Sequence, residues 1–458
     1  MQGNPDKIES LKHLLDKHEI KYSFAQGGKV SGYNYTTSSQ GQINSTSKDL
    51  VVSTNQPKGK MVKALFEPKT KLSDSITYDI TAWSLPYAYG LKTMASEKLV
   101  QSNNKNQTTV NNSISKTATG YIVDWNHLKD AEFLTHLLKQ SIKVRFTEKP
   151  LQTEGKSFNR GSLIIIRGDN KKASNFDATV LKSANKYNRK LNAIQSGFST
   201  KGPDFGSPGI KLVNKQKIAM LSGKDTSSLN YGALWHFFEK QLHYPIISIN
   251  TENFSYIDLN KYTVLIIPNG NYKRVLNDTA LKKLKAWVSK GGKIIAIGNA
   301  LNAFADKKEF KLKKHKTEDK KEKDSVNLIP YASRERNHIK STISGAIFKT
   351  KVDHSHPMAF GYSNIYHTLK LGSNAFKLLG DRNYNVAYIG NNPEKVSGFA
   401  GSTAIKKLNN SLVFGEERIG NGSIIYMIDD VMFRSFWENG KLFLVNAIFF
   451  VNNNAIEL

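Results

Sequence analysis

The chain has 458 residues, 39% of them hydrophobic, which suffices for about two to three folded domains and excludes a wholly disordered protein. The formal charge of +28 would suit an anionic partner, but only ten of the 66 basic residues are Arg, and the basic residues are spread along the sequence. Because Arg best suits bidentate phosphate and base contacts, this composition argues against nucleic-acid binding. The absence of Cys excludes disulfides, thiolate metal ligands and thiol nucleophiles in this chain.

Residues 1–214 are expected to form a mixed α/β region. A helix leading into a strand is predicted by "KIESLKHLLDKHEIKYSF", and a polar stretch follows from Ser31 to Lys48. The Asn/Ser/Thr-rich run from Gln101 to Thr119 predicts a flexible loop. A strand, helix and strand then occur twice and predict an open α/β sheet, first in "YIVDW", "HLKDAEFLTHLLKQ" and "IKVRF", then in "GSLIIIRG", "DATVLKSANKYNR" and "LNAIQS".

Residues 215–458 are expected to form a second domain, which begins after the Gly/Pro-rich "SGFSTKGPDFGSPGI". Apolar strands alternate with helices in "KIAMLSG", "PIISI", "YTVLIIPNG", a helix over 278–290 and "GGKIIAIGNA". This alternation predicts an open, mostly parallel, flavodoxin-like sheet. The run "KKEFKLKKHKTEDKKEKD" predicts a solvated charged insertion near 306–325. The late apolar run from Leu442 has ten residues, against about twenty for a membrane span, and predicts core.

A metal site is conceivable in "LWHFFEKQLHYP", where His236, Glu239 and His243 have a spacing that could hold zinc on one side of a helix. A catalytic zinc would also need a general base and a cation for the substrate, and the sequence nearby offers neither. Helical periodicity places the three residues on the flank of an apolar stripe. We therefore favour a structural helix whose buried stripe comprises Tyr231, Leu234, Trp235, Phe238 and Leu242.

Seven segments are distinctive in combination: "YDITAWSLPYAYGL", "FNRGSLIIIRG", "GPDFGS", "YGALWHFFEKQLHYP", "AWVSKGGKIIAIGNA", "HPMAFGY" and "DDVMFRSFWENGKLFLVNAIFF". They resemble the C-terminal half of large bacterial zinc carboxypeptidases of the M14 family, and the resemblance runs in order from about residue 7 to residue 450. The resemblance implies that a peptidase domain precedes a region with a class I glutamine-amidotransferase-like fold.

The resemblance implies that the parent protein removes C-terminal residues from peptides, with zinc held by an HxxE pair and a distant His in an N-terminal peptidase domain. This chain would be the accessory region after that domain, with no cofactor and no catalytic residue of its own. The domain would be its partner, in the periplasm or outside the cell. The start "MQGNPDKIESLKHLL" lacks secretory-signal features, so an export signal is expected outside the sequence shown.

An alternative is a stand-alone, non-catalytic amidotransferase-like module that binds a carbohydrate, a peptide or a surface ligand. Amidotransferase chemistry itself needs a Cys at the sharp turn after the central strand. In this chain the corresponding turn holds Gly298 and Asn299. The fold is therefore expected to act as a scaffold or a binding module.

A second conceivable metal site lies in "VDHSHP", which brings Asp353, His354 and His356 close in sequence. In an extended segment these side chains would not share a face in a simple way, whereas a turn could gather them around a metal. The resemblance of the segment that ends in "HPMAFGY" favours a packed structural turn. We expect no metal here.

Overall fold

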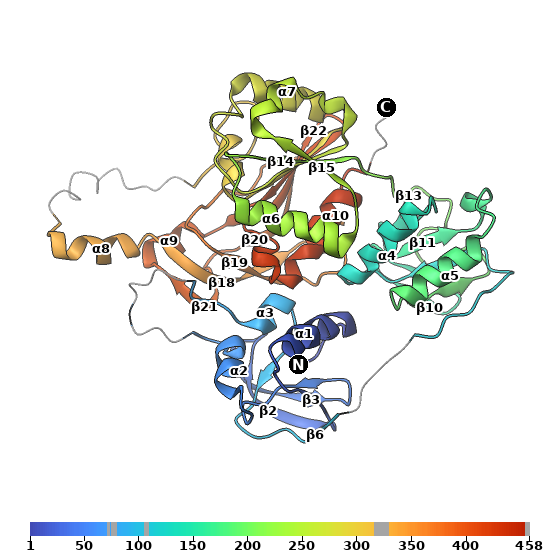
Figure 1. The fold of residues 1–458 in the computed structure, drawn as a ribbon, viewed down its shortest axis with the longest axis horizontal. Helices are drawn as coiled ribbons and strands as arrows, with labels where there is room; N and C mark the ends of the chain where they lie inside the picture. Colours follow the sequence, from blue (N-terminus) through green and yellow to red (C-terminus); the bar gives the residue numbers. More distant parts are fainter. Residues whose placement is uncertain (71–73, 75–79, 105–109, 316–328, 454–458) are drawn as a thin grey trace.

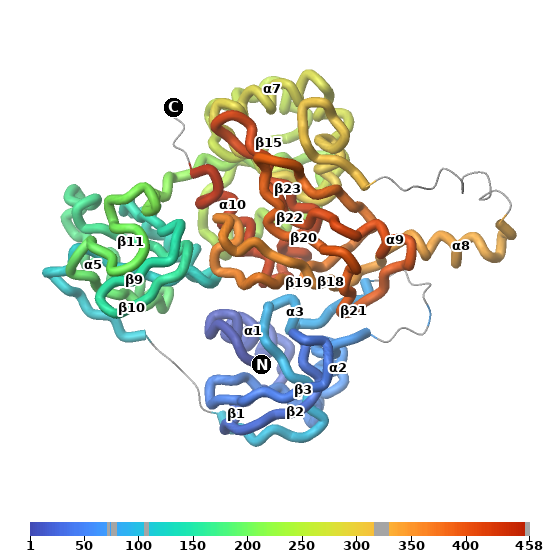
Figure 2. Tube along the Cα trace, turned by 180° about the vertical axis from the view of Figure 1, so that it is seen from behind, coloured from blue at the N-terminus to red at the C-terminus, as the bar shows by residue number. Residues whose placement is uncertain are grey.

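The computed structural model describes residues 1–70, 74, 80–104, 110–315 and 329–453. Figure 1 shows an N-terminal part in blue, a part built on a small sheet in cyan and green, and a larger part built on a ten-stranded sheet. Seen from behind, the small sheet stands beside the large one, and the N-terminal part packs beneath both (Figure 2).

The N-terminal part combines short helices with two three-stranded sheets. Helix α1 starts at Asn4, whose side chain accepts a hydrogen bond from the backbone N–H of Asp6, and it buries Ile8, Leu11 and Leu15 at helical spacing. The elements are α1 (Pro5–Lys17), β1 (Ser23–Ala25), β2 (Gly28–Asn34), β3 (Ser39–Ser45), β4 (Leu50–Val51), α2 (Gly59–Phe66), α3 (Leu85–Tyr89), β5 (Met94–Ala95) and β6 (Ser102–Asn103). The sheet orders are β4-β1-β6 and β3-β2-β5.

Strands β2 and β3 form a hairpin that lies mostly in the polar stretch from Ser31 to Lys48, for which the sequence predicted no strand. None of the residues in either strand is buried, so the alternation of apolar and polar residues that indicates a half-buried strand does not arise. Part of the predicted loop between Gln101 and Thr119, residues 105–109, lies outside the described residues.

The small sheet has the order β12-β7-β11-β8-β13, and every neighbouring pair in it is antiparallel. The expected strand-helix-strand units are present. Strands β7 and β8 run in the same direction but do not pair, because β11 lies between them. The elements are β7 (Gly120–Val123), α4 (Leu128–Lys139), β8 (Arg145–Thr147), β9 (Leu151–Thr153), β10 (Lys156–Phe158), β11 (Leu163–Ile166), α5 (Phe176–Lys186), β12 (Asn192–Ile194) and β13 (Ile210–Leu212).

The large sheet begins with five parallel strands in the order β15-β14-β16-β17-β23, which is the flavodoxin-like order for the first four. The remaining strands, β22, β20, β18, β19 and β21, are antiparallel to their neighbours, so the sheet is mixed and not mostly parallel. The expectation of a parallel sheet therefore holds only for the first half. A chain reversal at 420–421 turns β22 back onto β23 and starts the antiparallel half.

The elements of this part are β14 (Ile218–Ser222), α6 (Ser228–His236), β15 (Ile246–Asn250), β16 (Val264–Ile267), α7 (Asp278–Ser289), β17 (Lys293–Ile297), α8 (Tyr331–Ile339), β18 (Ile343–Val352), β19 (Ile365–Lys370), β20 (Tyr384–Ile389), β21 (Lys395–Ala400), α9 (Ser402–Lys407), β22 (Ser411–Ile419), β23 (Gly422–Met427) and α10 (Lys441–Phe449). Helices cover both faces of the parallel half, with α7 on one side and α6 and α10 on the other (Figure 1). Successive residues of β17, such as Ile294 and Ile295, therefore enter apolar clusters on opposite faces of the sheet. This explains why the strand is apolar along its length and does not alternate with polar residues.

The predicted boundary near residue 215 falls between β13 and β14. Segments of the first half nevertheless enter the core of the second. Thr81 Oγ1 donates to the carbonyl oxygen of Gly345 (2.6 Å), and Trp125 Nε1 donates to Asn446 Oδ1 of α10 (2.8 Å). The division into 1–214 and 215–458 stays a prediction.

Two local expectations need correction or qualification. The charged run is not wholly a solvated insertion, because Phe310 and Leu312 are buried in the cluster beside α7, while its residues 316–325 lie outside the described part. In the described part of the chain, no helix combines the length and apolarity that a bilayer crossing requires.

Candidate functional site

The helix that carries His236 differs from the expected one. After α6 the chain continues as a π-helix over Phe237–Leu242, and the wider turn shifts the buried face. Trp235 is therefore 39% exposed and Tyr231 half-buried, whereas Phe237 is buried together with Leu234, Phe238 and Leu242. The predicted stripe was right for three residues and wrong for Tyr231 and Trp235.

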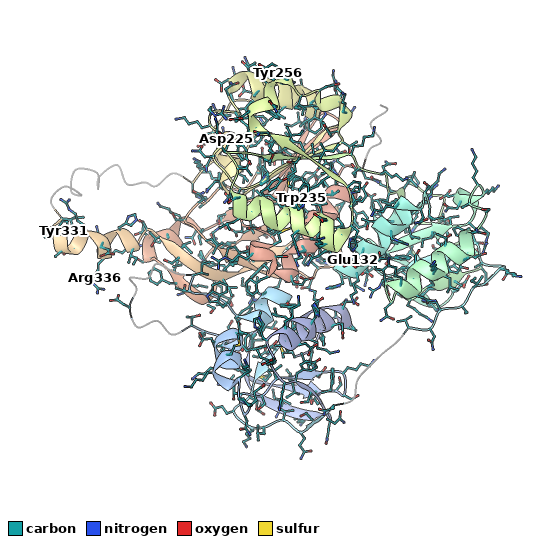
Figure 3. The ribbon with its side chains drawn as sticks, in the orientation of Figure 1. Glu132, Asp225, Trp235, Tyr256, Tyr331 and Arg336 are labelled. Carbon is teal, nitrogen blue, oxygen red and sulfur yellow. The ribbon has the colours of Figure 1, made fainter. Side chains whose placement is uncertain are left out.

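His236, Glu239 and His243 are all exposed, and the described residues contain no group of three His, Asp or Glu placed to hold a metal. The Glu239 carboxylate accepts a hydrogen bond from Trp235 Nε1 (2.6 Å) and pairs with Lys240 (3.0 Å). His243 Nδ1 lies 2.9 Å from the Glu239 carbonyl oxygen and so donates to it. These contacts belong to the helix end, and Figure 3 shows Trp235 on α6 at the surface.

Asp353, His354 and His356 likewise have separate surroundings. His356 is buried, its Nδ1 accepts from the Met358 backbone N–H (3.2 Å), and its Nε2 donates to Glu416 (2.7 Å), so neither ring nitrogen is free for a metal. Asp353 accepts from the backbone N–H and hydroxyl of Ser355, while His354 is exposed.

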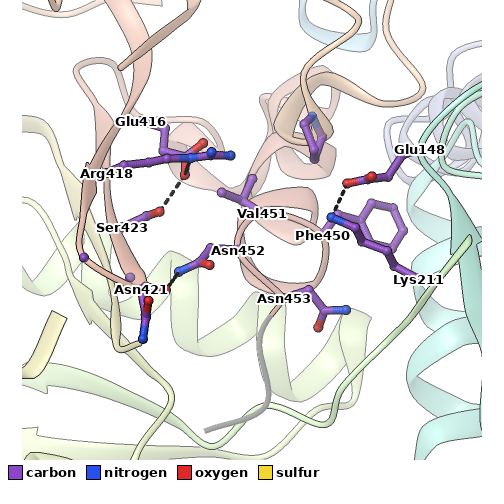
Figure 4. A pocket seen from close by; sticks show the side chains of 13 residues that line it. Glu148, Lys211, Glu416, Arg418, Asn421, Ser423, Phe450, Val451, Asn452 and Asn453 are labelled. Atoms are coloured by element: carbon purple, nitrogen blue, oxygen red, sulfur yellow. Dashed lines mark hydrogen bonds and ion pairs between the residues drawn. The ribbon is translucent and has the colours of Figure 1, made fainter. Parts of the chain in front are cut away.

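A pocket of about 350 Å³ lies beside Glu416, between the small sheet and the start of β23 (Figure 4). Its polar groups bind one another: Glu148 pairs with Lys211 (2.8 Å), and Ser423 donates to Glu416 (2.5 Å). Glu148 and Lys211 lie at the small sheet, and Glu416 and Ser423 lie on β22 and β23 of the large sheet. The four groups therefore satisfy one another in two pairs.

A second cleft, of about 210 Å³, opens at the carboxyl ends of the parallel strands β14, β16, β17 and β23. This edge is where open α/β sheets bind their ligands, because the loops that follow parallel strands converge there. Its polar lining comprises Ser227, Asn230, Asn269, Asn299, Lys370, Asn374, Asp429, Asp430 and Arg434, and its apolar lining includes Leu229, Leu371, Ile428 and Phe433.

The turn after β17 forms the floor of this cleft. Gly298 has φ +60°, and a Cβ there would lie 2.8 Å from Asn269 Oδ1, so glycine is required for both conformation and space. The backbone N–H of Asn299 donates to the same Asn269 oxygen (2.9 Å). The turn that the resemblance matched to the Cys position of amidotransferases is thus tight. Its second residue is Asn299, whose backbone N–H is already bound.

Buried charges form one wall. Asp429 accepts from Lys370 Nζ (2.8 Å) and from Thr368 Oγ1 (2.7 Å), and all three residues are buried. The ammonium and the hydroxyl offset part of the cost of burying this carboxylate. Strand β19 therefore supplies the partners of a carboxylate that follows β23.

Asp430 is the neighbouring carboxyl group. Its Oδ2 accepts from Asn230 Nδ2 (2.9 Å), and its Oδ1 accepts from the Met432 backbone N–H (3.1 Å). Burial raises the pKa of Asp430, and the nearby Asp429 charge raises it further, outweighing those hydrogen bonds. Asn230 also accepts from the Asn269 backbone N–H (2.8 Å), so α6 and the loop after β16 are tied to this wall.

Arg434 lies at the mouth of the cleft. It has φ +50° and Ser435 has φ +58°, a left-handed pair that costs about 1–3 kcal/mol for each such residue. Its exposed guanidinium stands 5.7 Å from the ring centroid of Trp83 and 5.2 Å from that of Phe433. A strained backbone therefore presents a cation that rests on aromatic faces.

No family model and no curated protein sequence matches this chain. Similar solved structures include a protein described as a GMP synthase subunit from Thermoplasma acidophilum, with TM-score 0.32 and 10% identity over 51% of this chain and 95% of that one. A glutamine amidotransferase from Thermotoga maritima has TM-score 0.30 and 6% identity over 51% and 97%.

Another similar structure is an exo-beta-1,4-mannosidase from an Opitutaceae bacterium, strain TAV5, with TM-score 0.29 and 9% identity over 51% of this chain. The chain spans 36% of the length of that mannosidase. Glutamine-amidotransferase-like structures are thus among the neighbours of this chain, but similarity at this level carries no argument about its function.

The turn at Gly298 was identified from the sequence, but the residues around it were not. Asn269, Asp429 and Asp430 each follow an apolar strand, in "LIIPNG" and "IIYMIDD", and the rule that polar loops after parallel strands converge would have pointed to them. Lys370 and Arg434 carry no such signal, because β19 is antiparallel and Arg434 lies in the aromatic segment "FRSFW", beyond the acidic pair that follows β23.

Proposed function

We propose that this chain is an accessory, non-hydrolytic region of a zinc carboxypeptidase-like protein, and that it binds part of the peptide substrate in the cleft at the carboxyl edge of the parallel strands. The observation that carries the proposal is a cleft lined by amides, carboxylates and one exposed guanidinium around a tight turn without a nucleophile. Such a site binds a polar ligand, and its turn carries no thiol or hydroxyl for covalent chemistry.

Two further observations support the proposal. The seven segments that resemble the peptidase family run through both halves of the chain. Two of them pack directly together, because Asn446 Nδ2 donates to the carbonyl oxygens of Met358 (3.0 Å) and Phe360 (2.8 Å). A packed, continuous region of this kind is suited to act as one unit beside a catalytic domain.

The test is incubation of the purified chain with peptides whose C-termini are free or blocked, and with glutamine. We expect peptide binding in calorimetry without release of amino acids or ammonia. Peptide hydrolysis that a chelator abolishes and zinc restores would refute the non-hydrolytic role. A peptidase domain with an HxxE motif in the same reading frame upstream would support the accessory role, and a separate unrelated protein there would refute it.

A stand-alone carbohydrate-binding module is the second candidate, and one surface feature favours it. The rings of Tyr231 and Trp235 stack at the surface with centroids 6.0 Å apart and an interplanar angle of 29°. Exposed aromatic faces of this kind stack on sugar rings. Quenching or shift of Trp fluorescence by an oligosaccharide, lost in Trp235→Ala, would favour this candidate.

A further inference from the structure

The carboxylate oxygens of the cleft each accept a hydrogen bond already. Both oxygens of Asp429 and both oxygens of Asp430 accept hydrogen bonds from neighbouring groups, as does Oδ1 of Asn230. A ligand that offered mainly donors would have to share these oxygens with the groups already bound to them, in a largely buried wall. The wall therefore does not favour a cationic ligand.

The donors of the cleft are in the opposite situation. Asn269 uses its Oδ1 for the Asn299 backbone N–H, and because a backbone N–H can only donate, the atom facing it is the oxygen. Asn299 in turn uses its Oδ1 for Asn374 Nδ2 (2.7 Å). Within the described residues, the Nδ2 groups of Asn269 and Asn299 are thus left to donate into the cleft.

Arg434 adds a positively charged donor to these two amides. It forms no ion pair within the described part of the chain and contacts only the faces of Trp83 and Phe433. Ser227, Leu229 and Asn230 also line the cleft, so the N-terminus of the nine-residue helix α6 contributes a further positive potential. Arg434 and the two amides thus place three donor groups at the cleft, and the unpaired guanidinium attracts an anion.

We propose that the cleft binds the free C-terminal carboxylate of a peptide, with Arg434 and the amides of Asn269 and Asn299 donating to its oxygens. A carboxylate fits better than a phosphate, because one guanidinium balances one charge and the Asp429–Asp430 wall repels a second. Leu229 and Leu371, which are 76% and 40% exposed, offer an apolar rim for the last side chain. This inference rests on the proposed peptide-binding function and names the group that is bound.

The experiment is calorimetric titration of the full chain with acetyl-Ala-Ala-Leu as the free acid and as the C-terminal amide. We expect the acid to bind at least about tenfold more tightly than the amide, since hydrogen bonds to a charged group are the strong ones. Arg434→Gln should weaken binding of the acid by about the same factor and leave the amide unchanged. Arg382→Gln is the matched control, because Arg382 is also exposed and left-handed (φ +66°) but does not line the cleft.

The outcomes separate the two proposals. Equal binding of acid and amide, or unchanged binding by Arg434→Gln, would refute carboxylate recognition while peptide binding stands. Failure of both peptides to bind at millimolar concentration would refute both proposals. Release of leucine from the free acid would refute the non-hydrolytic function alone. Tighter binding of glucuronate than of the tripeptide acid would refute the peptide as the source of the carboxylate.

Discussion

The charge of Lys293 is predicted to make the fold less stable at neutral than at alkaline pH. Lys293 is the first residue of β17 and is 2% exposed, and its Nζ donates to the Ile448 carbonyl oxygen in the last turn of α10 (2.8 Å). Burial lowers its pKa from 10.5 to about 7, although the Glu416 charge opposes the change. Between pH 7 and 10.5 the unfolded chain therefore binds the proton more tightly, so stability rises with pH over that window.

The shift of the Lys293 pKa from 10.5 to about 7 corresponds to a change of about 5 kcal/mol in the free energy of unfolding across this pH window. At pH 7 the fold lacks nearly all of that stability. Lys293→Met removes this loss but leaves the Ile448 carbonyl without its donor, at a cost of about 1–3 kcal/mol. We expect a net stabilisation of about 2–4 kcal/mol at pH 7 and a destabilisation near pH 10.5.

Urea unfolding followed by circular dichroism at pH 7 and pH 10 would measure the effect. The exposed Lys290, at the end of α7, provides the matched control Lys290→Met, which should follow the wild type at both pH values. Other groups that titrate at alkaline pH are common to all three proteins and cancel in the comparison. Equal changes of stability with pH in wild type and Lys293→Met would refute the buried charge.

Three other predictions concern stability. Phe238→Ala should lower the stability measured in thermal unfolding by about 3–5 kcal/mol, because the ring is 1% exposed. His236→Ala should change stability by less than about 0.5 kcal/mol. Stoichiometric zinc that is present in the wild type and lost in His236→Ala would contradict this prediction. His127 is 3% exposed and burial lowers its pKa from 6.5 to about 4, so stability should fall by up to about 3 kcal/mol as pH drops from 6.5 to 4. The melting temperature of His127→Asn should depend less on pH in that window, and an unchanged dependence would count against the buried neutral ring. Asn446→Ala should cost about 2–4 kcal/mol, because Trp125 Nε1 and two carbonyl oxygens lose their partners, and a melting temperature within about one degree of wild type would contradict this.

Much of the parallel half was predictable from local pattern. The apolar runs that became β14, β16 and β17 lie with both faces buried, and α7 occupies Asp278–Ser289 against a predicted 278–290. These elements could be predicted because the burial of each residue follows from the hydrophobic pattern of its own segment. The β2–β3 hairpin and the π-helix after α6 were not predictable in this way, since the first buries neither face and the second departs from the usual helical period.

The sequence by itself determined what chemistry the chain lacks and where its tight turn lies. Without Cys, and with Gly298 and Asn299 after the fourth parallel strand, the edge of the sheet has no thiol nucleophile whatever the packing. Only the tertiary structure decided which polar groups meet there. Asn230 and Asp430 are 200 residues apart and share a hydrogen bond, because the carboxyl ends of parallel strands lie at one edge regardless of their separation along the chain. Strand alignment, which no local pattern records, therefore brought Arg434 and the two amides to one cleft.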